Sequence, residues 1–514
     1  MDKEITSGKC SLLGVLAIVL GTSVYSRADV STESPSGQEE ILRLSETVES
    51  TVADLESYIP EYMQGKEIPG VAICLIRDGK VVWTKGFGVV HTITGKPVTS
   101  ETLFEVASNS KVVTAYVALR LVDQGKLALD KSLNSYLPDP WLPYSEYRDS
   151  ITLRHVLSHS SGLGHNTLDR TSLFAPGRGY SYSGMGFLYL QAVIEHLEGQ
   201  SLEDVAQELA FVPLGMSSTS YVNRDDLTPR TANGHVHAIV PIVLFTVPYL
   251  VSLVIVGCLG LLILRIWKGH WRPKRSMIIG AAAVAFGLTV LTVFLFLGGL
   301  GLLEFAWLIT FCGLIMASTF ALAFVFGRRV LSRLFPQRIR HQSRLVIAWS
   351  VITLFGLILL ASEIANVPVP RWPAVPAGAA SSVRATAGDM AAFLIELSSP
   401  RHLSHETARQ LQEPQVRLSS DLSWGLGPGI QHSEQGNALW QWGQHIDFQS
   451  VMIIYPEHGF GVVVLTNNDL FSPEVAIDLA HRALGGKIDP IHRGSHLEFD
   501  YREGTRRNGE DPRQ

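Results

Sequence analysis

The stretch FEVASNSKVVTA at residues 104–115 places a serine three residues before a lysine, at the start of an apolar helical run. One helical turn separates Ser108 from Lys111, so both side chains fall on the same helix face. Two interpretations are open. Ser108 is either the N-cap of a helix that begins near Lys111, or a nucleophile whose proton the Lys111 amine removes. One serine-lysine spacing is too short a pattern to decide between them.

The composition of the whole chain is unusually apolar for a soluble enzyme. Its 514 residues carry a formal net charge of -5, a mean hydropathy of +0.20 and 17% charged residues. A weakly acidic chain has no general basic character that would favour nucleic acid as a partner. The excess of apolar residues should therefore be concentrated in particular segments.

Two regions hold this excess. Residues 1–28 combine Lys3 and Lys9 with a short apolar core at 11–25 and then small residues, which is typical of a secretory signal. An uncleaved N-terminal anchor is the alternative. Residues 238–364 contain four apolar stretches, each near the ~20 residues that a membrane helix needs. These predicted spans cover about residues 238–264, 277–303, 305–327 and 345–361.

The loops between the spans predict their orientation. Residues 265–275 and 328–344 are rich in arginine and lysine, whereas the connection at Glu304 has no basic residue. Because basic loops face the cytoplasm, an even number of crossings places residues 29–237 and 362–514 on the other side. We expect an integral, multi-pass protein of the cell (inner) membrane, with an extracytoplasmic domain and membrane lipid as a partner.

The halves outside the predicted membrane block contain short strands and helices. PGVAICLIRDGKVVWTKGFGVV at 69–90 gives two strands around a turn at 77–80, and residues 448–467 give two more. Helical stretches with glycine stops lie between them. We expect one α+β sheet built from both halves. The predicted divisions are a linker at 29–44, domain halves at 45–237 and 365–490, and a charged tail at 491–514.

Four segments, in order, resemble the serine β-lactamase-related family, which includes class C β-lactamases, low-molecular-weight penicillin-binding proteins, D-aminopeptidases and esterases. They begin with FEVASNSK at 104, ITLRHVLSHSSGL at 151, YSYSGMGF at 180 and WQWGQHIDFQSVM at 440. The resemblance covers about residues 45–235 and 370–485. It implies a β-lactamase-like α+β fold, an antiparallel sheet flanked by helices with a helical subdomain, here interrupted by a four-helix transmembrane bundle.

The resemblance also assigns roles to individual residues. It implies that Ser108 is the nucleophile, Lys111 its base and Tyr182 the partner that shares the proton relay. Two positions depart from the family. Gly184 stands where an asparagine is usual, and Gln441 stands where the family has a lysine or a histidine. Both changes put β-lactam turnover in doubt, while ester or small-amide hydrolysis stays compatible with the motifs.

The third motif completes the implied site. Gln441 and Gly443 align with the family strand that lines it, and Gly443 would let substrate approach the backbone. The backbone N–H groups of Ser108 and Gln444 would form the oxyanion hole. A competing alignment centres on His445. Because the membrane block separates Ser108 from this strand, the site is complete only if both halves pack together.

The resulting functional hypothesis is an acyl-enzyme serine hydrolase for an ester, amide or peptide, without a cofactor or a metal. The substrate would be a membrane-adjacent amphiphile, because the site would be tethered near lipid. Two other classes stay open: a penicillin-binding-type sensor that is acylated without turnover, and an inactive binding scaffold. Protein partners are not specified by any motif.

Other polar patterns are given structural roles. The four cysteines are scattered, so no CxxC metal site is available, and Cys74 should be a small core residue. His159 should hold a turn. His235 and His237 form an HxH for which a membrane-interface loop is favoured over a metal site. Asp389 belongs to a helix-start capping box and not to catalysis.

Overall fold

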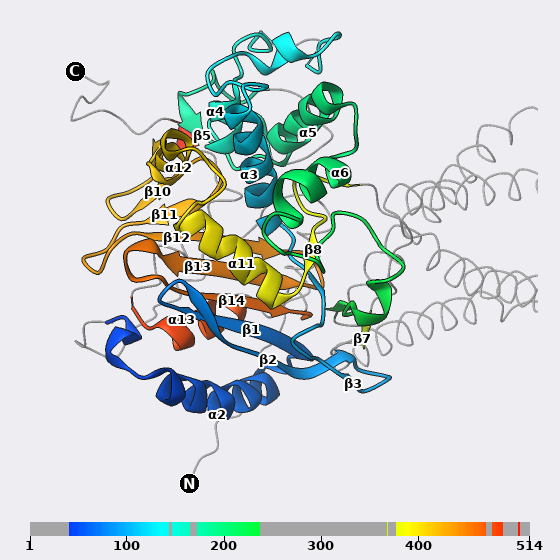
Figure 1. Ribbon diagram of the computed structural model, residues 1–514, viewed down its shortest axis with the longest axis vertical. Coiled ribbons are helices and arrows are strands. Elements are labelled where there is room, and N and C mark those ends of the chain that lie inside the picture. Colours follow the sequence, from blue (N-terminus) through cyan, green and yellow to red (C-terminus); the bar gives the residue numbers. More distant parts are fainter. Residues whose placement is uncertain are drawn as a thin grey trace, which may run out of the picture. The chain divides into compact units, whose positions relative to one another are not determined.

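The computed structural model describes residues 41–142, 146–164, 172–236, 367–368, 377–468, 475–486 and 502–503 (Figure 1). The predicted signal at 1–28 and the four predicted spans within 238–364 lie outside these ranges. So do most of the linker and of the charged tail, and also Cys10, Cys258, Cys312 and His237. None of the described helices has the length and apolar character that a membrane crossing requires. The membrane spans therefore stay a prediction.

The chain divides into two compact units. One comprises Met1–Thr32 and Val236–Pro373, of which the structure describes Val236 and the strand β7 (Val367–Pro368). The other comprises Glu33–His235 and Ala374–Gln514. This second unit carries the central sheet, the described helices and every residue of the predicted site.

An antiparallel sheet of nine strands forms the centre of the second unit, in the order β3-β2-β1-β14-β13-β12-β11-β10-β9. β1 pairs with β14, with Val71 opposite Thr466, so the two halves of the chain join in one sheet. The prediction of a single α+β sheet from both halves is confirmed. The strands are β1 (Gly70–Arg77), β2 (Lys80–His91), β3 (Lys96–Pro97), β9 (Val416–Arg417), β10 (Leu422–Trp424), β11 (Gly429–Gln431), β12 (Ala438–Gln444), β13 (Gln449–Tyr455) and β14 (Phe460–Thr466).

The predicted hairpin between β1 and β2 is also confirmed. Its two turn residues, Asp78 and Gly79, have φ angles of 52° and 67°. A two-residue turn with both φ angles positive matches the right-handed twist of the flanking strands, and an Asp-Gly pair adopts it readily. The local sequence thus sets the register of the first two strands before any distant contact forms.

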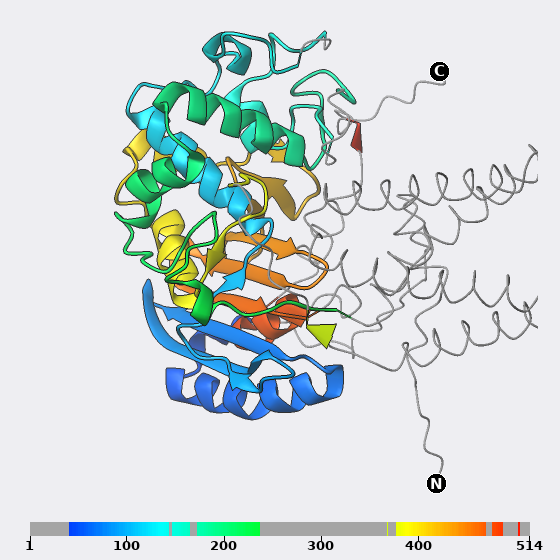
Figure 2. The ribbon, with the colours of Figure 1, turned by 90° about the vertical axis from the view of Figure 1, so that its right-hand side faces the viewer.

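Both faces of the sheet are buried, which β1 shows by strict alternation. Val71, Ile73 and Leu75 pack into a core with α2 (Val48–Lys66) and α13 (Val475–Leu484). The intervening Ala72, Cys74 and Ile76 pack into a second core with α11 (Ala387–Ser398). Figure 2 shows α11 and α13 on opposite sides of the sheet. A strand buried on both sides explains why β1 is apolar throughout, and Cys74 is the small core residue that was predicted.

A group of helices lies beside this sheet and forms the helical subdomain (Figure 1). Its central helix is α3 (Asn109–Asp123), which is buried along most of its length. The others are α4 (Leu153–Leu157), α5 (Gly184–Glu198), α6 (Leu202–Ala206), α12 (His405–Gln412) and the short segments Leu133–Tyr136 and Gln207–Phe211. Three single turns lie outside this group, at Arg43–Ser45, Thr228–Arg230 and Pro456–His458. Three small two-stranded sheets pair β4 (Phe104–Glu105) with β8 (Arg384–Ala385), β5 (Gly179–Tyr180) with β15 (Arg502–Glu503), and β6 (His235–Val236) with β7.

Candidate active site

Ser108 lies in the turn between β4 and α3 and its side chain is almost fully buried. It occupies the N-cap position of α3, but its hydroxyl makes no capping hydrogen bond. The preceding Ala107 has a φ of 44°, and a left-handed conformation costs a residue with a Cβ atom about 1–3 kcal/mol. Strain of this kind is held at functional turns, whereas a capping serine needs none. The geometry therefore disfavours the purely structural reading of Ser108.

Lys111 lies one helical turn later and points back to the serine. Its Nζ is 3.0 Å from Ser108 Oγ and 3.0 Å from the carbonyl oxygen of Ala380. The lysine side chain is 2% exposed. The Ser108 hydroxyl oxygen stands at hydrogen-bonding distance from this buried amine. The pair has the arrangement that proton transfer from Ser108 to Lys111 requires.

Tyr182 lies against this pair from the segment that leads into α5. Lys111 Nζ is 4.7 Å from the centre of the tyrosine ring, and Gln441 Nε2 donates a hydrogen bond of 3.0 Å to the tyrosine hydroxyl. Both Tyr182 and Gln441 are buried. The structure therefore brings together four of the predicted site residues, Ser108, Lys111, Tyr182 and Gln441, from both halves of the chain.

His159 explains how Tyr182 is held. Its ring stacks on the ring of Tyr182 with 4.2 Å between their centres, and its Nδ1 accepts a 2.9 Å hydrogen bond from the Ser183 N–H. Its own φ is 55°, a left-handed turn conformation. The expected role of His159 in holding a turn is confirmed. The aromatic contact gives Tyr182 a packing function in addition to any chemical one.

Gly184 is the first residue of α5 and is buried. The N-cap is the neighbouring Ser183, whose hydroxyl accepts a 2.9 Å hydrogen bond from the Gly186 N–H and donates to the Gly164 carbonyl. A glycine here brings no side chain to the site. The amide that the family places at this position therefore has no equivalent at residue 184.

Gly443 lies in β12 opposite Ser450 of β13 and closely faces the serine turn. A Cβ atom at this position would come within 2.3 Å of the Val106 carbonyl oxygen and 2.8 Å of the Ser108 nitrogen. The expectation was that a glycine is needed for substrate to approach the strand. That expectation stays a prediction, and the structure adds a requirement of its own: the backbone of the serine turn fills the space that a side chain would take.

The Gln444 N–H points to the side of β12 that faces away from β13. In an antiparallel ladder, successive N–H groups alternate between the two edges of a strand. His445 donates its N–H to the Phe448 carbonyl at 2.9 Å, so the preceding Gln444 N–H faces the opposite edge. With Gly443 packed on the Ser108 nitrogen, this orientation is compatible with an oxyanion hole between Ser108 and Gln444.

Three polar residues near Ser108 were not predicted from the sequence, namely Glu105, Asn109 and Ser450. Ser450 donates a 2.8 Å hydrogen bond to the Val106 carbonyl and accepts one of 2.8 Å from Asn109 Nδ2. Glu105 accepts a 2.8 Å hydrogen bond from His445 Nδ1. Their partners are 340 or more positions away in the sequence. The one available signal was an acidic residue inside the apolar run that leads to Ser108.

The other polar residues that were assigned structural roles from the sequence bind backbone or capping groups. His235 is buried, accepts a hydrogen bond from the Thr92 N–H and donates one to the Asn467 carbonyl, and burial lowers its pKa to about 4. Within the described residues no three histidine, cysteine or acidic side chains are grouped as metal ligands. Thr386 caps α11 by accepting from the Asp389 N–H, and Asp389 in turn accepts from Ser218 and Thr219. Asp389 thus has the helix-start position that was predicted.

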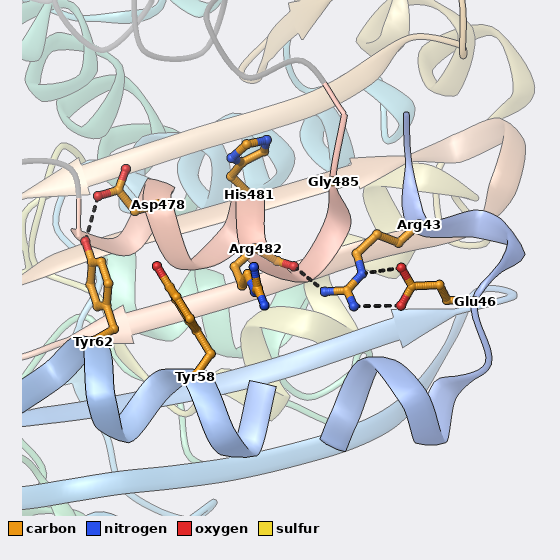
Figure 3. Close-up of a pocket in the computed structure, with 8 residues that line it drawn as sticks. All are labelled: Arg43, Glu46, Tyr58, Tyr62, Asp478, His481, Arg482 and Gly485. Carbon is orange, nitrogen blue, oxygen red and sulfur yellow. Dashed lines mark hydrogen bonds and ion pairs between the residues drawn. The ribbon is translucent and has the colours of Figure 1, made fainter. Parts of the chain in front are cut away.

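A cleft of about 560 Å³ lies elsewhere on the second unit, between α2 and α13 (Figure 3). Within it Arg43 binds Glu46 and Tyr62 donates to Asp478, while Arg482 pairs with Asp54 outside the lining. None of the predicted site residues lines it. Its lining residues are Arg43, Glu46, Tyr58, Tyr62, Asp478, His481, Arg482 and Gly485.

Comparison with known proteins places this site in context. The family model described as "Beta-lactamase" matches residues 55–248 and 360–487, well over half of the chain. Esterase EstB of Burkholderia gladioli is 28% identical over 209 residues, which are 34% of this chain and 53% of the esterase. Penicillin-binding protein 4 of Amycolatopsis lactamdurans is 31% identical over 186 residues, 33% of this chain and 49% of that protein. The chain spans about half the length of these curated relatives.

Solved structures show the same fold at lower sequence identity. A class C beta-lactamase superposes with a TM-score of 0.54 and 15% identity, over 84% of this chain and 95% of that one. A penicillin-binding protein homologue from Pyrococcus abyssi gives a TM-score of 0.52 and 18% identity, over 81% and 73% of the two chains. At these identities the likeness concerns the fold.

Proposed function

Since this chain belongs to the beta-lactamase family, we propose that it is a serine hydrolase whose Ser108 is acylated by an ester or a small amide. The observation that carries the proposal is the 3.0 Å separation of Ser108 Oγ from Lys111 Nζ in a buried site. In this proposal Lys111 removes the serine proton as the hydroxyl attacks the substrate carbonyl. The resulting oxyanion is held by the backbone N–H groups of Ser108 and Gln444.

The second half of the reaction uses the same groups. As the tetrahedral intermediate collapses, the bond to the leaving group breaks, and the proton returns to it from Lys111 or from Tyr182. A water molecule then attacks the acyl carbon while the same pair takes its proton. The bond between the acyl carbon and Ser108 Oγ breaks, the proton passes to Oγ, and the acid leaves. The contact between Lys111 and the ring of Tyr182 supports a shared role for these two residues.

The surroundings favour a neutral ester over a penicillin. A carboxylate beside the scissile bond is usually met by a positive charge, but Gln441 is uncharged. Its Nε2 already donates to the Tyr182 hydroxyl and to the Trp442 carbonyl. Gly184 offers no side-chain amide to an acylamide substrate. Esters and small amides need neither contact.

We further propose that the site lies outside the cytoplasm, on a protein that crosses the cell (inner) membrane through residues 238–364. The four apolar stretches and the basic loops support this location. A substrate held near the bilayer would be an amphiphile, such as a lipid-linked peptide or a lipid ester. Protease protection of membrane vesicles, read by mass spectrometry, tests the orientation, because cleavage from the cytoplasmic side should fall within 265–275 and 328–344.

The catalytic proposal is tested by labelling. Purified full-length protein and the Ser108→Ala variant are treated with a fluorophosphonate and, separately, with a fluorescent penicillin, and intact mass is followed over time. Ser108-dependent fluorophosphonate labelling, with hydrolysis of p-nitrophenyl butyrate, is expected. Persistent penicillin labelling without hydrolysis would indicate the acylated sensor. The absence of labelling with either probe would indicate the inactive binding scaffold.

A further inference from the structure

An ion pair that the proposed mechanism does not use lies next to the turn that carries Ser108. His445 Nδ1 donates to Glu105 Oε2 at 2.8 Å. Glu105 lies in β4, three residues before Ser108. His445 directly follows Gln444 at the end of β12. The pair therefore connects the two backbone segments that would supply the two N–H groups of the oxyanion hole.

The segment that contains Gln444, at the end of β12, has little other backbone pairing. β11 pairs with β12 from Ala438 to Trp440 and reaches no further along it, so residues 441–444 are paired in the described sheet by β13 on one edge. In the proposed function this edge carries the Gln444 N–H and must stay open for substrate. A side-chain contact behind the strand can fix its distance from the serine turn without filling that opening.

The ion pair belongs to a charged cluster that keeps it rigid. Arg384 of β8 stands opposite Glu105 of β4 in the strand register and forms an ion pair with its other carboxylate oxygen. Asp447, in the turn between β12 and β13, is buried and lies against Gly234. The Glu105 and Arg384 side chains are 17% and 9% exposed, so water screens this cluster weakly.

We infer that Glu105 and His445 are positioning residues that hold the Ser108 and Gln444 N–H groups at the separation which stabilises the oxyanion. This inference rests on the proposed function and deepens it. Neither side chain needs to touch the substrate. An oxyanion hole works through donors fixed in advance, and a misplacement of about 1 Å can reduce the rate roughly 100-fold.

The same cluster makes the separation between the Ser108 and Gln444 N–H groups dependent on pH. Burial opposes the charge on His445, but the hydrogen bond and charge of Glu105, helped by Asp447, raise the pKa of His445 above its usual value; Lys111 lowers it in part. Burial opposes ionisation of Glu105, yet His445 and Arg384 bring its pKa down to about 2. Burial and Glu105 raise the pKa of Asp447 to about 7. The charged pair is therefore complete below the raised pKa of His445 and is lost as the pH rises through that pKa.

The test compares His445→Ala and His445→Gln in the full-length protein, with p-nitrophenyl butyrate as the probe. His445→Ala should lower kcat roughly 10- to 100-fold with KM nearly unchanged, because donors to the transition state move while substrate binding does not. His445→Gln keeps a donor for Glu105 without a titrating charge. It should recover most of kcat, and it should lack the fall of activity at alkaline pH that we expect for the natural protein.

His402→Ala is the matched control, because His402 also pairs with a glutamate, Glu396, at 3.3 Å but lies away from the site. A merely structural role for His445 predicts equal losses of Tm and equal kcat values in the His402 and His445 variants, and that result overturns the inference. If the natural protein hydrolyses the ester through Ser108 while His445→Ala matches it in kcat, the inference alone fails. If the natural protein shows no Ser108-dependent labelling or turnover, the proposed function fails and the inference with it.

Discussion

At the scale of single residues, Gly443 shows that the packing of the protein's own backbone can require a glycine in a family motif. The glycine is expected to give substrate room, and independently of substrate the atoms that would collide with a Cβ atom are Val106 O, Ser450 Oγ and Ser108 N. The close packing of β12 on the serine turn is therefore part of the fold. A motif glycine can thus be required by the position of the serine turn before any substrate binds.

The Gly443→Ala variant should be destabilised and should lose reactivity together. The added methyl must displace the serine turn, and overpacking of this kind costs about 1–3 kcal/mol. Thermal unfolding and the rate of fluorophosphonate labelling measure the two effects. Gly65→Ala in α2 is the control, since a Cβ atom there would meet nothing within 4 Å. A Gly443→Ala protein that labels as fast as the natural one would show that the turn can move without consequence.

At the scale of elements, β6 shows how a short strand is anchored by one neutral histidine. His235 accepts from the Thr92 N–H and donates to the Asn467 carbonyl, so it links β6 to the loop after β2 and to the end of β14. Protonation would remove the acceptor atom and leave a buried charge. The HxH pattern in the sequence gave no indication of this, because both partners are backbone groups.

This arrangement predicts a loss of stability in mild acid. Burial lowers the folded-state pKa of His235 to about 4, whereas an unfolded histidine titrates near 6.5. The unfolded state then binds more protons between these values, so the free energy of unfolding should fall as the pH decreases from about 6.5 to 4, by about 2–3 kcal/mol. Denaturant unfolding at several pH values measures it. The slope should be reduced in His235→Gln, and an unchanged slope would assign the effect to other groups.

At the scale of the whole molecule, the sheet and the site are each assembled from two distant parts of the chain. β1 has β2 on one edge and β14 on the other. Ser108, Lys111 and Tyr182 come from the first half, while Gln441 and Gly443 come from the second. Neither half buries both faces of β1 by itself, because α2 belongs to the first and α11 and α13 to the second.

Expression of residues 41–236 and 377–486 as separate chains tests this interdependence. Each chain by itself should lack a cooperative unfolding transition and fluorophosphonate labelling, since each exposes an apolar sheet edge and half a site. Mixing the two should restore labelling at Ser108. The control mixes the second chain with the Ser108→Ala form of the first, and labelling of the first chain without its partner would contradict the prediction.

The sequence by itself determined the local structure and the chemical types at the site. The Asp-Gly turn, the glycine ends of α3 and α5, the serine-lysine spacing and the order of the motifs all follow from neighbours within a few residues or from resemblance. They could be predicted because turn geometry and helix periodicity depend on short-range sterics. The same reasoning assigned Cys74 to the core and His159 to a turn.

Only the tertiary structure decided which distant groups meet. The contact of Gln441 with Tyr182, the packing of Gly443 on the serine turn and the pairing of Glu105 with His445 join residues more than 250 positions apart. No periodicity or spacing encodes such contacts, because they result from the order of strands in the sheet and from the burial of both its faces. The serine-lysine pair could be read from the sequence, whereas the strand beside it and its charged support come from the packing of the two halves.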